Sequence, residues 1–144
     1  MSNVTVAKSA GFCFGVDRAV KIVYNELEKN TKVATLGPII HNQDVVNDMK
    51  MKGARVIESV DELLPYETVV IRSHGVGRNI YEQITVKGNR MLDATCPFVS
   101  KIHKIVAEKT KEGYLILIAG DISHPEVQGI IGHCEQNYIV FKDN

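Results

Sequence analysis

Thr68-Val69-Val70-Ile71-Arg72 leads directly into Ser73-His74-Gly75-Val76-Gly77. The first of these stretches is apolar and β-branched along nearly its whole length, as in a strand that is covered on both faces. The residue pattern after the second predicts a helix from about Arg78 to Lys87. A buried strand that passes through a short polar turn into a helix is the repeating unit of a parallel α/β sheet.

The same unit recurs on both sides of this stretch. We predict further strands at 4–7, 32–36, 54–57, 90–92, 114–119 and 137–141. Helices are predicted at 17–29, 42–52, 98–111 and 126–131, with a single helical turn at 61–64. This alternation predicts an α/β fold with mainly parallel sheets and right-handed crossovers. The last strand would lack a covering helix, so we expect the chain to be the front part of a longer protein.

Composition narrows the class of protein. The chain has 144 residues, of which 44% are apolar and 24% charged, as in a globular protein with a real core. Basic and acidic residues balance at 17 each, which gives no reason to expect nucleic acid as a partner. Neither an apolar run of about 20 residues nor a secretory leader is seen, so we expect a cytoplasmic protein that does not span a membrane. Three cysteines argue against a disulfide framework.

Two cysteines lie in similar turns. Cys13 lies in the turn 11–15 before a predicted helix, and Cys96 directly precedes Pro97 at the start of another. We expect Asp93 or Thr95 to cap that second helix. The positive end of a helix dipole favours the thiolate, which binds metals and attacks electrophiles. The pair therefore indicates metal or redox chemistry.

Three histidines occupy the same kind of strand-to-helix turn: His41, His74 and His124. In a parallel sheet these turns gather at the carboxyl edge, where such folds bind ligands. Cysteine thiolates suit soft metals and iron–sulfur clusters, whereas histidines at helix starts suit a phosphate or diphosphate. Glu126, two residues after His124, is a candidate for carrying a proton to or from a substrate.

Each of these residues also has an ordinary structural interpretation. A cysteine at a helix start is often a small buried hydrophobe, and a loop histidine is often a capping residue. Glu126 in a first helical turn stabilises the helix dipole by default. His103 in mid-helix is expected to be solvated, His133 has no matching turn, and Cys134 is expected to be structural.

The stretch Gly11-Phe12-Cys13-Phe14-Gly15-Val16-Asp17-Arg18-Ala19 resembles the opening motif of the 4-hydroxy-3-methylbut-2-enyl diphosphate reductases, the last enzymes of the non-mevalonate isoprenoid pathway. Four more stretches resemble the next motifs of that family in order and spacing: Ile40-His41-Asn42, Ser73-His74-Gly75-Val76, Asp93-Ala94-Thr95-Cys96-Pro97 and His124-Pro125-Glu126-Val127. The resemblance covers essentially the whole chain.

The resemblance implies an iron–sulfur cofactor. Cys13 and Cys96 would be two of three thiolate ligands of a [4Fe–4S] cluster, whose fourth iron is open to the substrate hydroxyl. The third cysteine is expected beyond Asn144, and Cys134 does not lie in its motif.

The resemblance also implies roles for the other turn residues. His41, His74 and His124 would line the diphosphate pocket, and Glu126 would supply protons. The reaction would be reductive dehydroxylation of the allylic alcohol to isopentenyl and dimethylallyl diphosphates, with ferredoxin or flavodoxin as electron donor.

Members of this family are about twice as long and pack three similar α/β domains around the cluster. By this resemblance residues 1–96 form the first domain, and its first strand can join the sheet of the third. Residues 97–144 form the incomplete start of the second domain, and we expect the chain alone neither to hold the cluster firmly nor to turn over substrate.

Two other functions are compatible with the residues. The first is a cluster-free module that binds diphosphates with its three histidines and does not depend on Cys13 or Cys96. The second is an enzyme of another class in which Cys96 is an activated nucleophile.

Overall fold

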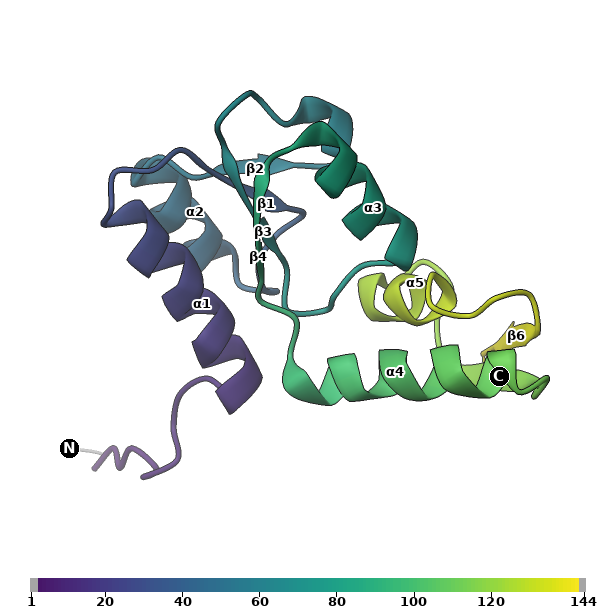
Figure 1. Ribbon diagram of the computed structural model, residues 1–144. Coiled ribbons are helices and arrows are strands. Elements are labelled where there is room, and N and C mark those ends of the chain that lie inside the picture. Colours follow the sequence, from purple (N-terminus) through teal and green to yellow (C-terminus); the bar gives the residue numbers. More distant parts are fainter. Residues whose placement is uncertain (1–2, 143–144) are drawn as a thin grey trace.

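A four-stranded parallel sheet forms the larger part of the computed structural model, which describes residues 3–142 (Figure 1). Its strand order is β2-β1-β3-β4, and the strands span Arg55–Ile57, Val33–Leu36, Thr68–Ile71 and Arg90–Asp93 respectively. All three strand pairs are parallel, with Val70 aligned between Thr35 and Leu92. The predicted α/β class with parallel sheets is therefore confirmed.

Helices cover both faces of this sheet (Figure 1). The helices α1 (Phe14–Leu27) and α2 (Gln43–Met51) lie on one face, and α3 (Arg78–Lys87) lies on the other beside the 3-10 turn η1 (Val60–Glu62). Two hydrophobic cores lie on opposite faces of the sheet. Successive residues of β3 point alternately into one and the other, because side chains alternate across a strand. Val70 packs in the cluster that includes Ala19 and Val23 of α1, whereas Val69 packs with Ile84 of α3.

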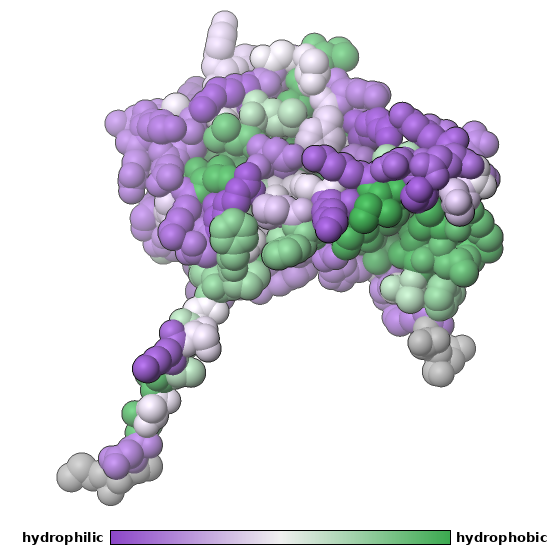
Figure 2. Space-filling model, turned by 60° about the horizontal axis from the view of Figure 1, so that its bottom comes forward, coloured by the Kyte–Doolittle hydropathy of each residue, from purple (hydrophilic) through white to green (hydrophobic). Residues whose placement is uncertain are grey.

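The second sheet is smaller. It pairs β5 (Ile116–Ala119) with β6 (Tyr138–Phe141) in parallel, and it follows α4 (Pro97–Lys111) and encloses α5 (Pro125–Ile131) in the sequence. Its outward face is apolar, since the register partners Leu117 and Ile139 are 63% and 51% exposed. Figure 2 shows this apolar area near the C-terminal end of the chain. The domain division predicted after residue 96 falls between the two sheets and stays a prediction.

The predicted first strand, residues 4–7, is wrong. These residues form no strand, and the segment runs away from the body of the molecule with Val4 88% exposed. A strand needs a neighbour to pair its N–H and C=O groups, and no strand between residues 3 and 142 lies beside this segment. For the same reason β5 begins only at Ile116, where pairing with Tyr138 starts.

The predicted helix cap is confirmed for α2 and is wrong for α4. Asn42 caps α2 as predicted, because its side-chain oxygen accepts a hydrogen bond from Val45 N at 3.1 Å. The cap predicted for α4 is wrong, since its N-cap is Cys96 and no side chain caps the helix. Asp93 Oδ1 instead accepts from Thr95 N at 2.9 Å, which folds the turn just before the helix. Between residues 3 and 142 no helix is long and apolar enough to cross a membrane.

Candidate functional site

The three turn histidines come together at the carboxyl edge of the main sheet. His41 follows β1, His74 follows β3, and His124 is the N-cap of α5. The ring centroids of His41 and His74 are 4.5 Å apart, and the His124 ring lies 5.8 Å and 5.9 Å from these two. We call these residues the histidine cluster. Three loops that are far apart in the sequence therefore bring their imidazole rings into one small region.

Hydrogen bonds of the Ser73 hydroxyl and backbone fix the loop that carries His74. The buried Ser73 hydroxyl donates to the carbonyl oxygen of Ile39 at 3.0 Å, which joins this loop to the one before His41. The Ser73 carbonyl oxygen accepts from Cys96 N at 2.9 Å. Ser73 thus links the cysteine turn to two histidine turns, a role that its sequence position alone did not indicate.

The environment of His74 favours the neutral ring. Burial, together with the positive charges of His41, Arg72 and His124 when they are protonated, lowers the pKa of His74 to about 4. His74 Nδ1 is buried and finds no hydrogen-bond partner within residues 3–142. At neutral pH the ring is therefore uncharged and offers a donor without repelling its neighbours.

His124 and Glu126 are coupled through the first turn of α5. His124 Nδ1 accepts a hydrogen bond from Glu126 N at 3.2 Å, so Nδ1 carries no proton and Nε2 carries one. This tautomer leaves Nε2–H free to donate to an anion. The Glu126 side chain is half-buried beside this turn.

The two cysteine turns also lie close together. Cys13 is the N-cap of α1 and Cys96 is the N-cap of α4. A β-carbon built on Gly15, two residues after Cys13, would lie 2.5 Å from Cys96 Sγ, so the thiol of Cys96 packs on the first turn of α1. Arg18 joins the same turns by donating to the carbonyl oxygens of Thr95 and Asp93 at 3.1 Å each.

The thiols in this part of the chain are suited to supply some, but not all, of the ligands of an iron–sulfur group. Cys13, Cys96 and Cys134 are all free thiols. Two of them, Cys13 and Cys96, are the N-caps of helices whose first turns contact each other at Gly15 and Cys96. Among the described residues, however, no three Cys, His, Asp or Glu side chains are grouped closely enough to hold a metal ion. The fit is therefore to two ligands of a larger set.

One further histidine differs from the sequence prediction. His103 was expected to be solvated but is only 4% exposed, because it lies on the face of α4 that packs on α5. Its ring stacks on that of His133 with centroids 4.3 Å apart. Hydrophobic periodicity missed the burial of both residues, since histidine is not counted as apolar.

Cys134 lies apart from the two cysteine turns. Its Sγ lies 3.5 Å from the carbonyl oxygen of Ile130, and burial raises its pKa.

The chain is similar in sequence to known proteins of one family. The chain matches the LytB protein family over residues 4–144. It is 50% identical over 143 residues to the 4-hydroxy-3-methylbut-2-enyl diphosphate reductase of Caldanaerobacter subterraneus subsp. tengcongensis, covering 96% of this chain and 50% of the relative. It is 46% identical over 141 residues to the enzyme of the same name from Clostridioides difficile, covering 97% of this chain and 50% of the relative.

Solved structures are similar as well. A structure described as (E)-4-hydroxy-3-methyl-but-2-enyl diphosphate reductase, the terminal enzyme of the non-mevalonate pathway, superposes with a TM-score of 0.81 at 42% identity. It covers 97% of this chain and 51% of the solved one. The E-1-hydroxy-2-methyl-but-2-enyl-4-diphosphate reductase of Plasmodium falciparum gives a TM-score of 0.88 at 30% identity, covering 93% and 42% respectively. The chain thus spans about half the length of the curated relatives that it matches.

Proposed function

The chain belongs to the LytB protein family, and from this membership we propose that it is the N-terminal portion of a 4-hydroxy-3-methylbut-2-enyl diphosphate reductase. The enzyme would convert (E)-4-hydroxy-3-methylbut-2-enyl diphosphate into isopentenyl and dimethylallyl diphosphates. The observation that carries the proposal is the histidine cluster, in which His41, His74 and His124 meet within 5.9 Å.

The histidine cluster is suited to the diphosphate end of such a substrate. Imidazole N–H groups donate hydrogen bonds to phosphate oxygens, and charge-assisted bonds of this kind are the strong ones. His124 already holds the tautomer that leaves Nε2–H as a donor. Arg72 lies close enough to His74 to lower the pKa of that ring, and its positive charge would attract the same anion.

Cys13 and Cys96 would hold a [4Fe–4S] cluster together with a third cysteine outside this chain. When bound, the cluster would supply electrons and a Lewis-acidic iron for the substrate hydroxyl. The contact between Gly15 and Cys96 Sγ supports this role, because it brings both thiol-bearing helix starts to one place. Arg18 would keep the Cys96 turn in position by its two hydrogen bonds.

Glu126 would supply a proton to the substrate. In the overall reaction the allylic C–O bond breaks, two electrons and two protons enter, and the oxygen leaves as water. A half-buried carboxyl next to His124 is placed to deliver one of these protons. The electrons would come from ferredoxin or flavodoxin.

Titration calorimetry with inorganic diphosphate tests the proposal. We expect saturable one-to-one binding near pH 7.5, weakened about 10- to 100-fold in His74→Ala and His41→Ala, as for loss of one charge-assisted hydrogen bond. Lys111→Ala, at the far end of α4, is the control and should bind like the unaltered chain. Absence of saturable binding, or equal affinity in the histidine variants, would overturn the proposed site.

The alternative function, a cluster-free module that binds diphosphates, predicts a different result. Such a module would bind diphosphate equally well after Cys13→Ala and Cys96→Ala and would retain no iron.

A further inference from the structure

A stacked pair of histidines lies behind the histidine cluster. The His103 ring from α4 and the His133 ring, just after α5, have centroids 4.3 Å apart and planes inclined by 22°. His133 Nε2 is 3.0 Å from the carbonyl oxygen of Val76, so it donates to the loop that also carries His74. His103 Nε2 is buried and finds no partner among the residues described. The pair therefore connects α4, the end of α5 and the His74 loop.

Two glycines make room for the His103 ring. A β-carbon on Gly75, which follows His74, would lie 2.6 Å from His103 Cε1. A β-carbon on Gly129 of α5 would lie 3.1 Å from His103 Nε2 and 3.3 Å from the carbonyl oxygen of His74. The ring thus fits between the His74 loop and α5 and touches the backbone of both.

The His74 loop and α5 also carry the residues that are proposed to bind the substrate and to deliver a proton to it. The loop holds His74, and α5 begins at the His124 cap and holds Glu126 one turn before Gly129. Resting on the proposed function, we propose that His103 and His133 are positioning residues for the histidine cluster and Glu126. His103 acts as the spacer between loop and helix, and His133 ties the spacer to the loop through Val76.

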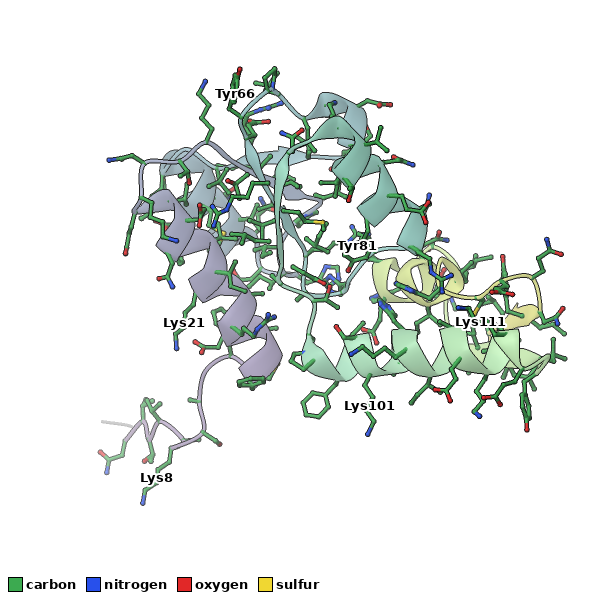
Figure 3. All side chains as sticks on the ribbon, viewed as in Figure 1. Lys8, Lys21, Tyr66, Tyr81, Lys101 and Lys111 are labelled. Carbon is green, nitrogen blue, oxygen red and sulfur yellow. The ribbon has the colours of Figure 1, made fainter. Side chains whose placement is uncertain are left out.

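The surroundings keep the pair neutral near pH 7. Burial and the neighbouring His133 lower the pKa of His103 to about 4, and burial and Arg78 lower that of His133. Asp93 acts in the opposite direction on both rings. The pair lines a cavity of about 300 Å³ with Lys104 and Tyr81, and the ring of Tyr81, labelled in Figure 3, lies 6.4 Å from that of His133. Stacked neutral rings can pack closely, whereas two cationic rings at this separation would repel each other.

Histidine-selective NMR combined with diphosphate calorimetry tests the positioning role. In His103→Ala we expect the imidazole resonances of His74 and His124 to shift and the affinity for inorganic diphosphate to fall about tenfold, because misaligned groups bind poorly. His103→Gln, which keeps a neutral side chain in the gap, should restore the affinity to within about threefold. Lys111→Ala, at the exposed far end of α4, should leave both readouts unchanged.

The two readouts separate this inference from the function on which it rests. If the unaltered chain does not bind diphosphate, the proposed function fails, but the shifts of His74 and His124 still decide the positioning role. Unshifted His74 and His124 resonances in a folded His103→Ala chain would overturn it. If that variant does not fold, His133→Ala, at the half-buried end of the pair, is expected to shift the His74 resonance in the same way. An unchanged spectrum in His133→Ala would also overturn the inference.

Discussion

The thiol of Cys96 packs on the backbone of Gly15, where a β-carbon would come within 2.5 Å of the sulfur. Only a residue without a side chain fits this position in the first turn of α1. Two helices that are separated by more than sixty residues in the sequence thereby bring their N-terminal ends, and the cysteines that start them, to one place.

Gly15→Ala should therefore destabilise the chain even though alanine is the better helix former by about 1 kcal/mol. We expect urea denaturation to show a loss of about 1–3 kcal/mol, the usual cost of overpacking. Adding Cys96→Ala removes the sulfur and should recover part of this loss. Strictly additive effects of the two substitutions would contradict the contact.

Arg18→Ala should loosen the Cys96 turn. Arg18 donates to the carbonyl oxygens of Thr95 and Asp93, and the loss of both bonds is expected to cost about 1–3 kcal/mol in the free energy of unfolding. Lys21→Ala is the matched control on the same helix, because Lys21 makes only an exposed ion pair with Asp17, which is worth about 0.5 kcal/mol. Equal effects of the two substitutions would show that Arg18 does not hold the turn.

Glu26 is a buried carboxylate whose two cationic partners should not be equivalent. It is 1% exposed and pairs with Arg90 of β4 and with Lys29 one turn away. Arg90→Ala should cost about 2 kcal/mol, somewhat less than for a fully buried pair, because Lys29 remains to compensate the charge. Lys29→Ala should cost clearly less, since Lys29 is 59% exposed. Chemical denaturation of both variants measures the difference, and a reversed order would refute it.

Acid should destabilise the fold through the buried histidines. Burial lowers the pKa values of His74 and His103 to about 4, whereas an unfolded histidine titrates near 6.5. Between these values the unfolded chain binds more protons than the folded chain, so stability is complete above about pH 6.5 and falls as the pH decreases toward 4. Each histidine contributes a slope of at most about 1.4 kcal/mol per pH unit.

His103→Gln isolates the contribution of one ring. Urea denaturation between about pH 7.5 and pH 4.5 should give a shallower decline for this variant, because one titrating group has been removed. Parallel curves for the variant and the unaltered chain would contradict the lowered pKa of His103.

Most of the main sheet could be predicted from the sequence because its signals are local. The apolar run 68–71 and the turn after it identify β3, and Asn42 identifies the start of α2. Residues 4–7 have the same kind of local signal, but no strand within residues 3–142 lies beside them. Pairing, which sequence pattern does not encode, decides whether they form a strand.

The candidate site could be predicted only as a set of residue types at one sheet edge. That His41, His74 and His124 meet follows from how three loops fold, and it is fixed by contacts such as Ser73 to Ile39 that leave no motif of their own. His103 was misjudged because its burial depends on α5, whose packing on α4 is not a periodic feature of either helix.

Anaerobic reconstitution with iron, sulfide and an excess of a small thiol as the missing ligand tests the central claim most directly. We expect a brown product with about four irons per cluster that is lost in Cys13→Ala and Cys96→Ala. Cys134→Ala should retain it, because that thiol lies outside the paired helix starts. Failure of the unaltered chain to retain iron, or equal retention after Cys96→Ala, would contradict the claim that the two cysteine turns form one cluster-binding site.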